Sequence, residues 1–265
     1  MSTSAIALVL VSAVLHAGWN AHLHKLPDPQ VVIALSYLSV GVVLLPVAVT
    51  NPPSGVWWFV LASIVAHAIY QWMLGSAYGE GSLGVAYPIS RGTAPLLVGI
   101  GGWMLLGEKP SPFTAVGLVV LVAGLLLLAG VGWRLAERRA VVMALISGLA
   151  TVGYSLLDAE AVDRTHPLGY LSVVSVVGAT VVLVLRRPSV DRLRQAFAPG
   201  LLVGVGQGGA YGLILLAFQR AQAGQVAGLR QVSILLGVFL AGEALGRRAW
   251  WGAALVAGGA FLVVW

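Results

Sequence analysis

The residues of this chain that could do chemistry are ionisable and hydrogen-bonding side chains set inside long apolar stretches. His16 and Asn20 lie four positions apart, as do His67 and Gln71, so each pair shares one face of a helix. An ionisable group in an apolar environment is costly, so each is a candidate for binding a polar molecule or carrying a proton. The residues we expect to line a common cavity are His16, Trp19, Asn20, His67, Tyr70, Gln71, Tyr87, Arg91, Tyr154, Asp158, Gln207, Tyr211, Arg230 and Gln231.

Two kinds of chemistry are open to this set. Arg91 and Arg230 carry guanidinium groups that only Asp158 opposes within the set, so they should attract a carboxylate or a phosphonate. We therefore expect an anionic or zwitterionic metabolite, such as an amino acid. His16 and Asp158 are the candidates for carrying a proton, because histidine titrates near physiological pH and burial favours a neutral carboxyl group.

Several of these residues also have a purely structural explanation. His16 and His67 could form hydrogen bonds between helices without touching a substrate. Asp158 and Arg230 lie near the ends of their apolar stretches and could extend to the membrane interface, which is harder for the more central Arg91. The two explanations differ in whether the polar faces meet at a water-accessible cavity or at protein-filled contacts.

The elements that must position these side chains are apolar runs of about 20 residues, the length that crosses a membrane. Connectors rich in Pro, Gly, Asn and Asp separate them, and one of these breaks is expected at Pro199-Gly200. We predict ten transmembrane helices, at Ser4–Leu23, Val31–Val49, Val56–Tyr78, Leu83–Leu106, Phe113–Gly130, Val141–Leu157, Leu168–Leu185, Gly200–Ala221, Val226–Gly242 and Trp250–Trp265.

Composition supports this assignment and excludes other classes of protein. Of 265 residues, 59% are hydrophobic and 9% are charged, whereas a soluble domain carries about 25% charged residues. The absence of cysteine excludes a disulfide scaffold. The chain is therefore an all-α polytopic membrane protein by composition.

Partners and cofactors follow from the same composition. The net charge of +6 comes from bases in short connectors, so we expect no nucleic-acid partner. The glycine-rich run 204–209 follows no strand and is explained by close helix packing, and His-Glu-x-x-His does not occur. We expect no cofactor, no metal and no enzymatic activity, and the expected partners are membrane lipid and a small-molecule substrate.

The two halves of the chain resemble each other. Leu106-Gly107-Glu108 ends the fourth predicted helix as Ala241-Gly242-Glu243 ends the ninth. Glycines 117 and 124 of the fifth helix correspond in the same way to glycines 252 and 259 of the tenth. An odd number of helices per unit inverts the second copy, as in inverted-repeat transporters. We predict two inverted five-helix repeats at 4–130 and 141–265, joined by a basic connector at 131–140.

The distribution of bases predicts an orientation. The connectors after the second, fourth, sixth and eighth helices hold only Lys109, Arg164 and Arg220. By the positive-inside rule, the more basic connectors face the cytoplasm and both termini lie outside. Those connectors, after the fifth, seventh and ninth helices, hold Arg134, Arg138, Arg139, Arg186, Arg187, Arg192, Arg194, Arg247 and Arg248.

Other residues are expected to have structural roles. Trp57, Trp58, Trp250 and Trp251 lie at helix ends and are expected to sit at the membrane interface. Glu108, like Glu243, is expected to be an anchor at the interface.

Four segments together resemble a known family. The fourth-helix run from Tyr87 to Leu97, followed by Leu105-Leu106-Gly107-Glu108, resembles the signature of EamA-type transporters of the drug/metabolite transporter superfamily. The runs 16–20, 154–158 and 229–233 are similar to the family's first-, sixth- and ninth-helix motifs. The resemblance covers nearly the whole chain and is specific for the superfamily but not for a substrate.

The resemblance implies ten helices in two inverted repeats, with a central cavity lined by helices one, three, four, six, eight and nine. These are the helices that carry the candidate residues. Two features depart from the family pattern. Arg230 lies about one helical turn closer to Glu243 than Arg91 lies to Glu108. The family usually places both termini in the cytoplasm, opposite to the orientation that the bases predict.

The expected function is that of a secondary transporter, in the cytoplasmic membrane of a prokaryote, for a small polar or amphipathic metabolite. Transport would proceed by alternating access, driven by an ion gradient such as that of protons or by the substrate's own gradient. The alternative from another class is a non-transporting membrane scaffold or accessory subunit, whose polar side chains only join helices. An intramembrane enzyme would need a nucleophile and base pair that the sequence does not offer.

Overall fold

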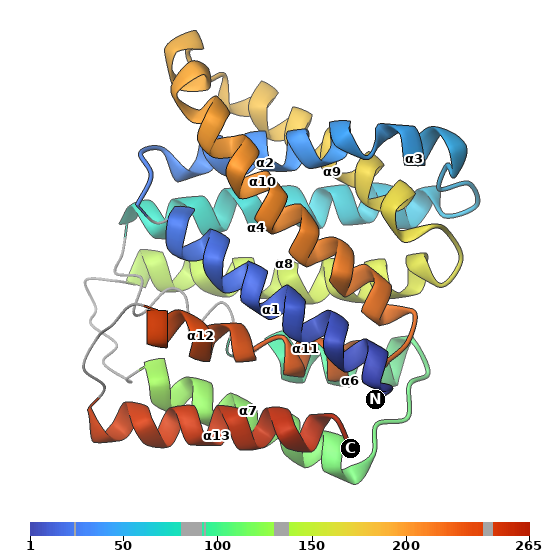
Figure 1. The fold of residues 1–265 in the computed structure, drawn as a ribbon, viewed down its shortest axis with the longest axis vertical. Helices are drawn as coiled ribbons and strands as arrows, with labels where there is room; N and C mark the ends of the chain where they lie inside the picture. Colours follow the sequence, from blue (N-terminus) through green and yellow to red (C-terminus); the bar gives the residue numbers. More distant parts are fainter. Residues whose placement is uncertain (24, 81–91, 93, 130–137, 241–245) are drawn as a thin grey trace.

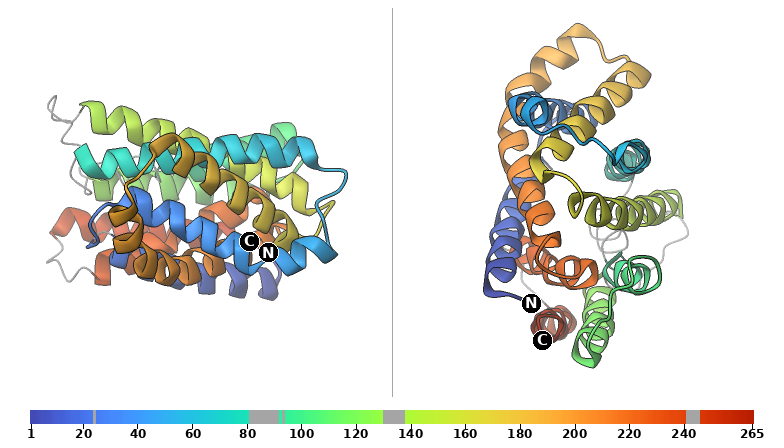
Figure 2. Two further views of the ribbon diagram at one scale, coloured as in Figure 1. Left: turned by 90° about the horizontal axis from the view of Figure 1, so that it is seen from above. Right: turned by 90° about the vertical axis from the view of Figure 1, so that its right-hand side faces the viewer.

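The computed structural model describes residues 1–23, 25–80, 92, 94–129, 138–240 and 246–265, and within these ranges every regular element is a helix. The helices lie side by side in one bundle, and the two termini meet at the same end of it (Figures 1 and 2). The Met1 amino group donates a hydrogen bond of 2.7 Å to the backbone oxygen of Val264. We call this the termini end of the bundle and the other the opposite end.

The first half of the chain forms α1 (Thr3–Leu23), α2 (Pro29–Val43), α3 (Leu45–Thr50), α4 (Trp57–Glu80), α6 (Ala94–Leu105) and α7 (Pro112–Ala129). The second half forms α8 (Arg138–Val162), α9 (Pro167–Arg186), α10 (Val190–Phe218), α11 (Ala223–Leu229), α12 (Val232–Leu240) and α13 (Arg247–Val263). Among the described residues these segments make ten crossing elements, because α2 with α3 and α11 with α12 each form one crossing. The predicted fold of ten transmembrane helices is confirmed.

Length and composition of the helices agree with a membrane protein. In the part of the chain that the structure describes, five helices are long and apolar enough to cross a membrane, namely α1, α4, α8, α9 and α10. Trp58 and Trp251 are mostly exposed, and each lies near the start of its helix at one end of the bundle. Such positions are typical of tryptophan at the two membrane interfaces.

Two predicted helices are interrupted. The second crossing bends at Leu44, between α2 and α3, where Pro46 occupies the first turn of α3 and has no backbone N–H to continue the ladder. The ninth crossing breaks at Arg230 and Gln231, where Gln231 N–H donates to the Gly228 oxygen and Ser233 N–H donates to that of Arg230. This three-residue spacing is that of a tight turn rather than an α-helix.

The break that we predicted at Pro199-Gly200 is wrong, because α10 continues through Pro199. Packing against α2 explains why the helix tolerates the proline. A Cβ atom on Gly200 would lie 2.8 Å from the Leu35 Cβ, and one on Gly204 would lie 3.1 Å from the Ser36 backbone oxygen. Small residues at four-residue spacing let two membrane helices approach closely, which is the role expected for this glycine-rich segment.

The repeats are inverted relative to each other. A Cβ atom on Gly117 would lie 2.8 Å from the Gly259 oxygen, and one on Gly252 would lie 3.0 Å from the Gly124 oxygen. Exchanging the repeats turns the first contact into the second, the reciprocity that a two-fold axis produces. The pairs α1–α10 and α4–α8 are also exchanged by this operation. Since α7 runs away from the termini end and α13 runs towards it, the axis lies in the membrane plane.

Candidate functional site

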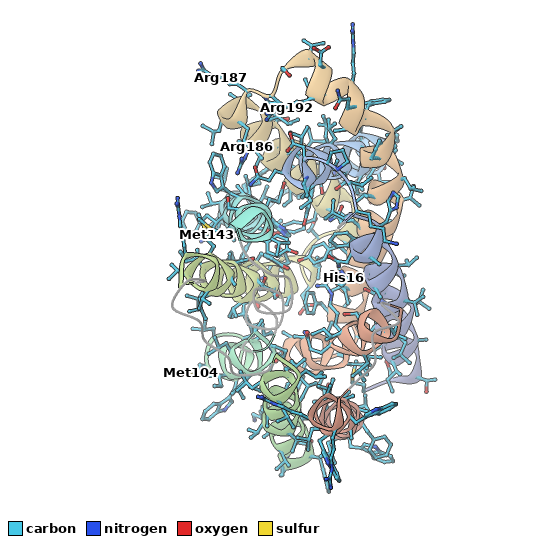
Figure 3. All side chains as sticks on the ribbon, turned by 90° about the vertical axis from the view of Figure 1, so that its left-hand side faces the viewer. His16, Met104, Met143, Arg186, Arg187 and Arg192 are labelled. Atoms are coloured by element: carbon cyan, nitrogen blue, oxygen red, sulfur yellow. The ribbon has the colours of Figure 1, made fainter. Side chains whose placement is uncertain are left out.

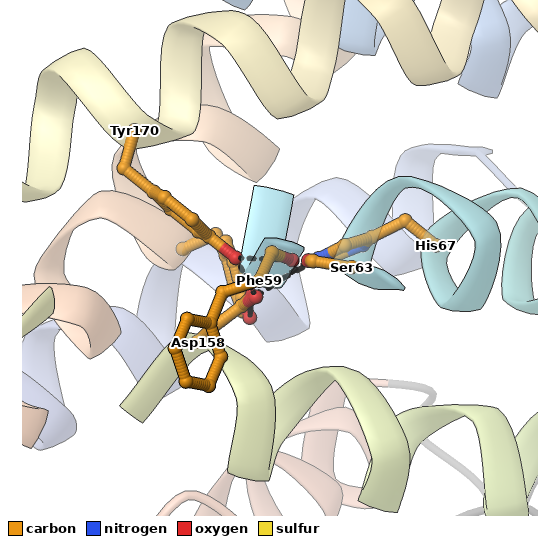
Figure 4. A network of polar contacts seen from close by, with 6 residues as sticks. Phe59, Ser63, His67, Asp158 and Tyr170 are labelled. Atoms are coloured by element: carbon orange, nitrogen blue, oxygen red, sulfur yellow. Dashed lines mark hydrogen bonds and ion pairs between the residues drawn. The ribbon is translucent and has the colours of Figure 1, made fainter. Parts of the chain in front are cut away.

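The Asp158 carboxylate is the centre of a buried polar cluster near the termini end (Figure 4). The side chain lies about one turn before the end of α8 and is 0% exposed. Its Oδ1 accepts hydrogen bonds from Ser63 Oγ at 2.5 Å and from the Tyr170 hydroxyl at 2.6 Å. Its Oδ2 accepts from the Tyr211 hydroxyl and from His67 Nε2, the latter at 3.2 Å. An ionised carboxylate has about four acceptor sites, so this one is saturated.

Three helices bring these donors to α8. Ser63 and His67 lie four residues apart on α4 and so share one face. Tyr170 lies in the first turn of α9, and Tyr211 lies about two turns before the end of α10. The His67 ring stacks on that of Tyr154 with centroids 4.1 Å apart. Its Nδ1 has no hydrogen-bond partner among the described residues.

Arg230 is the second buried charged group, at the break between α11 and α12. Its side chain is 8% exposed. Nη2 donates to His16 Nδ1 at 3.4 Å, and the guanidinium carbon lies 5.7 Å from the centre of the Tyr211 ring. Within the described part of the chain Nε has no partner. A buried donor left unpaired is costly, so this guanidinium is able to take an anionic acceptor.

Arg230 lies in the wall of a pocket between the two repeats. The pocket is narrow in this conformation, with enclosed room for about one water molecule. Its wall combines polar and apolar side chains, as the walls of small-molecule sites in proteins do. It is lined by Ala94 and Val98 of α6, by Thr151, Ser155, Ile214, Phe218, Val226 and Ala227 of the second repeat, and by Arg230 and Gln231.

The predicted residues thus fall into different surroundings. Asp158 and Arg230 turn inward rather than extending to the interface, as their burial requires. His16 also points into the bundle, whereas Met104 lies at its outer edge (Figure 3). Beside His16, the Asn20 side chain donates to the His16 backbone oxygen at 3.0 Å, and the Trp19 ring meets the imidazole edge-on.

Of the remaining predicted residues, some pack around these two clusters and the others are separate from them. Tyr70 packs on Tyr154 with ring centroids 5.5 Å apart. Gln71 and Gln207 are buried, and both polar atoms of Gln71 lack partners among the described residues. The predictions for Tyr87 and Arg91 lie outside the described residues.

Sequence reasoning missed four polar residues of the site. Ser63 shares a helix face with His67 and could have been found by that spacing. Tyr170 belongs to the seventh helix. A tyrosine in the first turn of a membrane helix is usually expected at the membrane interface, so no sequence signal distinguishes Tyr170 from such a residue. Thr151 and Ser155 line the pocket, but short hydroxyl side chains on apolar helices are too common to stand out.

Glu108 forms a separate contact between the repeats, in the connector between α6 and α7. Its Oε1 accepts from the backbone N–H of Ala223 at 2.6 Å, at the start of α11. Gly107 has a positive φ of 69°, which turns the chain back so that the carboxyl group lies against Gly102. Burial raises the pKa of Glu108, although the N–H groups of Ala223 and Gly224 lower it. Glu108, which we expected to be an interface anchor, therefore caps a helix of the other repeat.

This fold, with charged groups buried among apolar helices, defines a class, a multi-pass membrane protein. The model of the EamA-like transporter family matches residues 3–130 and 138–265, one match for each repeat, and the chain belongs to this family. A relative from Bacillus subtilis (strain 168), named the uncharacterized transporter YwfM, is 26% identical over 213 residues, which are 76% of this chain and 71% of the relative. These similarities point to a transporter rather than an enzyme.

A solved structure described only as a crystal structure of a protein has the same fold. It superposes with a TM-score of 0.81 at 18% identity, over 99% of this chain and 96% of that chain.

Proposed function

We propose that this transporter moves a small amphipathic carboxylate or zwitterion, amino-acid-like compounds included, across the cytoplasmic membrane of a prokaryote. Transport proceeds by alternating access of a secondary transporter, with protons as the coupling ion. The observation that carries the proposal is the buried guanidinium of Arg230, whose Nε is unpaired among the described groups, in a residue that lines a pocket between the repeats.

The side chains that line the pocket support this substrate class. Nε and one terminal nitrogen of a guanidinium can bind both oxygens of a carboxylate in a two-pronged contact. Gln231, Thr151 and Ser155 offer further hydrogen bonds, and Ile214 and Val98 face the apolar part of a ligand. A pocket between inverted repeats is the place where secondary transporters bind their substrates.

The proton site that fits best is the Asp158 carboxylate with His67. Because all its acceptor sites are occupied, a proton can bind only if one of the four donors is displaced. His16, the other candidate, accepts a hydrogen bond from Arg230, and a proton added there would stand beside a guanidinium. We therefore place His16 with the substrate and Asp158 with the proton.

Uptake into liposomes of purified protein tests the proposal. Isovalerate, L-leucine and isoamylamine share a branched apolar end and differ in charge, so they separate anion, zwitterion and cation. With an imposed pH gradient, isovalerate or L-leucine should accumulate beyond the passive uptake of protein-free liposomes, and isoamylamine should not. Arg230→Gln should abolish binding, as should Arg91→Gln at the corresponding helix of the first repeat. Arg220→Gln, which changes an exposed arginine at the termini end, is the matched control.

Two results would overturn the substrate class. One is accumulation of isoamylamine that survives Arg230→Gln. The other is the absence of binding of any of the three probes to the wild-type protein.

A further inference from the structure

One side chain touches both buried charged groups. The Tyr211 hydroxyl donates a hydrogen bond to Asp158 Oδ2, and the face of the same ring lies 5.7 Å from the guanidinium carbon of Arg230. We propose that Tyr211 is the positioning residue that couples proton binding at Asp158 to substrate binding at Arg230. The proposal rests on the proposed function, because it needs both a proton site and an anion site.

The groups that face Asp158 show why Tyr211 is suited to this role. On α4 they are Ser63 and His67, on α9 Tyr170, and on α10 Tyr211. The Tyr154 ring of α8 and the Tyr37 ring of α2 pack on His67, with centroids 4.1 and 5.9 Å from it, and Tyr154 also meets the Tyr211 ring. On α8 itself, Glu160 is paired with Arg164 near the surface. Of these described residues, Tyr211 alone also contacts Arg230.

The surroundings of the Tyr211 ring limit how it can move. It is 4% exposed and meets the rings of His67 and Tyr154 edge-on, at 5.4 and 5.8 Å. In a packed interior, a ring held on its sides cannot change one contact without changing the other. The tyrosine thus links the carboxylate and the guanidinium as a rigid body rather than as two independent contacts.

Protonation of Asp158 replaces an acceptor with a donor, so one of the four donors must turn away from it, and in this proposal that donor is Tyr211. When Tyr211 turns, the face of its ring moves away from the Arg230 guanidinium. The guanidinium then loses a contact that competes with a bound anion. Low pH should therefore strengthen the binding of a carboxylate. By thermodynamic reciprocity, a bound carboxylate strengthens proton binding at Asp158 by the same factor, which is typically about 5- to 150-fold.

The test compares two tyrosines that donate to the same carboxylate. Tyr211→Phe keeps the ring beneath Arg230 and removes the hydroxyl, whereas Tyr170→Phe removes the bond to the other carboxylate oxygen and does not touch Arg230. The measurement is the dissociation constant of isovalerate and of L-leucine between about pH 5 and pH 9, by isothermal titration calorimetry on protein in nanodiscs. The ratio of the affinities at low and at high pH measures the coupling between the two sites. The pH at the midpoint of the change reports the proton affinity of the proton site.

For the wild type we expect the affinity to rise at least about 5-fold from high to low pH. Tyr170→Phe should shift the midpoint and keep this ratio. Tyr211→Phe should bring the ratio close to one, and in liposomes it should keep substrate exchange while losing accumulation driven by a pH gradient.

Three outcomes count against the proposal in different ways. If Tyr211→Phe keeps the wild-type ratio, the two sites are coupled directly through space and the proposal is wrong. If both variants lose the ratio, the effect comes from disturbing Asp158, which also overturns the role of Tyr211. If the wild type binds a probe with no pH dependence, proton coupling itself fails, and with it the proposed coupling ion.

Discussion

At the scale of single residues, the unusual feature is the Asp158 carboxyl group, which is withdrawn from solvent with its acceptor sites filled. Each hydrogen bond to a charged group contributes about 1.5–3 kcal/mol, which offsets the cost of burial. The donors to Asp158 come from α4, α9 and α10, so losing one of them loosens a contact between helices. A proton at this position therefore acts on packing as well as on charge.

The first prediction concerns Asp158→Asn. The amide cannot exchange a proton, so we expect accumulation under an imposed pH gradient to fall at least about tenfold while exchange in a counterflow assay continues. Glu160→Gln makes the same chemical change one half-turn away on α8, at a partly exposed side chain, and should leave both activities intact. Normal accumulation by Asp158→Asn would show that the proton is carried elsewhere.

His16→Gln separates the two proton candidates in the same assays. Because His16 accepts from Arg230, its loss should weaken substrate binding by about 3- to 10-fold and leave the dependence on the pH gradient unchanged. If this variant instead loses accumulation and retains exchange, His16 is the proton carrier.

Sequence spacing identified Asp158, His67, Tyr211 and Arg230 as polar residues within apolar helices, but it could not pair them. Asp158 could equally have met an arginine. Instead its partners are Tyr170 and residues of α4 and α10 that lie far away in the chain. Which buried donor meets which acceptor depends on helix packing, which composition and spacing do not determine.

At the scale of elements, α11 depends on a residue from the other repeat. Its N-terminal backbone N–H groups have no partner within the helix, and the Glu108 carboxylate supplies one at 2.6 Å. Because Arg230 and Gln231 follow directly after α11, this cap also fixes the end of the helix that bears the pocket residues. Glu108 is therefore a positioning group for the pocket.

The second prediction follows from the raised pKa of Glu108. Its pKa in the folded protein lies above the ordinary value of 4.5 because of burial. The ionised form is thus disfavoured in the folded state, so the contribution of Glu108 to stability is largest below about pH 4.5 and falls as the pH rises through the folded pKa. Glu108→Gln, which stays neutral and keeps an acceptor oxygen, should raise Tm in detergent at pH 8 and leave it unchanged near pH 4.

Glu108→Ala is the companion variant. It removes the cap and should be about 1 kcal/mol less stable than Glu108→Gln at both pH values. A lower Tm for Glu108→Gln than for wild type at pH 8 would mean that the negative charge stabilises α11 more than burial disfavours it.

Helix positions were largely predictable from apolar runs, whereas helix interruptions were not. Pro199 does not break α10, because close packing of Gly200 on α2 holds the helix together. The ninth crossing breaks at Arg230, where no proline lies nearby and Gly228 is one of many glycines in these helices. Interruptions inside a membrane helix depend on what the freed backbone groups contact, and that information lies in the tertiary structure.

At the scale of the whole molecule, α7 and α13 join the repeats through reciprocal glycine contacts. A Cβ atom on Gly259 would lie 2.7 Å from the Gly117 oxygen, and one on Gly124 would lie 2.8 Å from the Gly252 oxygen. The third prediction is that Gly259→Ala and Gly124→Ala each cost about 1–3 kcal/mol, by similar amounts, in thermal unfolding. Gly258→Ala, on the same helix with open space around it, should be neutral or slightly stabilising. Unequal costs at the two corresponding glycines would contradict the symmetry.

The last prediction concerns how the molecule lies in the membrane. In the described residues, the termini end carries Lys109, Arg164 and Arg220, together with the acids Glu108 and Asp163. The opposite end is much more basic, and Arg186, Arg187 and Arg192 gather there around the α9–α10 connector (Figure 3). The positive-inside rule then places the opposite end in the cytoplasm and both termini outside.

This orientation decides which compartment the proton site faces, since the Asp158 cluster lies near the termini end. Alkaline phosphatase fused after Trp265 should be active, because it folds only outside the cytoplasm, and green fluorescent protein at the same position should stay dark. Replacing Arg186, Arg187, Arg192 and Arg194 with glutamine should reduce the phosphatase signal, whereas the same change at Arg164 and Arg220 should not. A fluorescent fusion in the otherwise wild-type chain would instead place the termini in the cytoplasm, as is usual in this family, and Asp158 would then load its proton from within the cell.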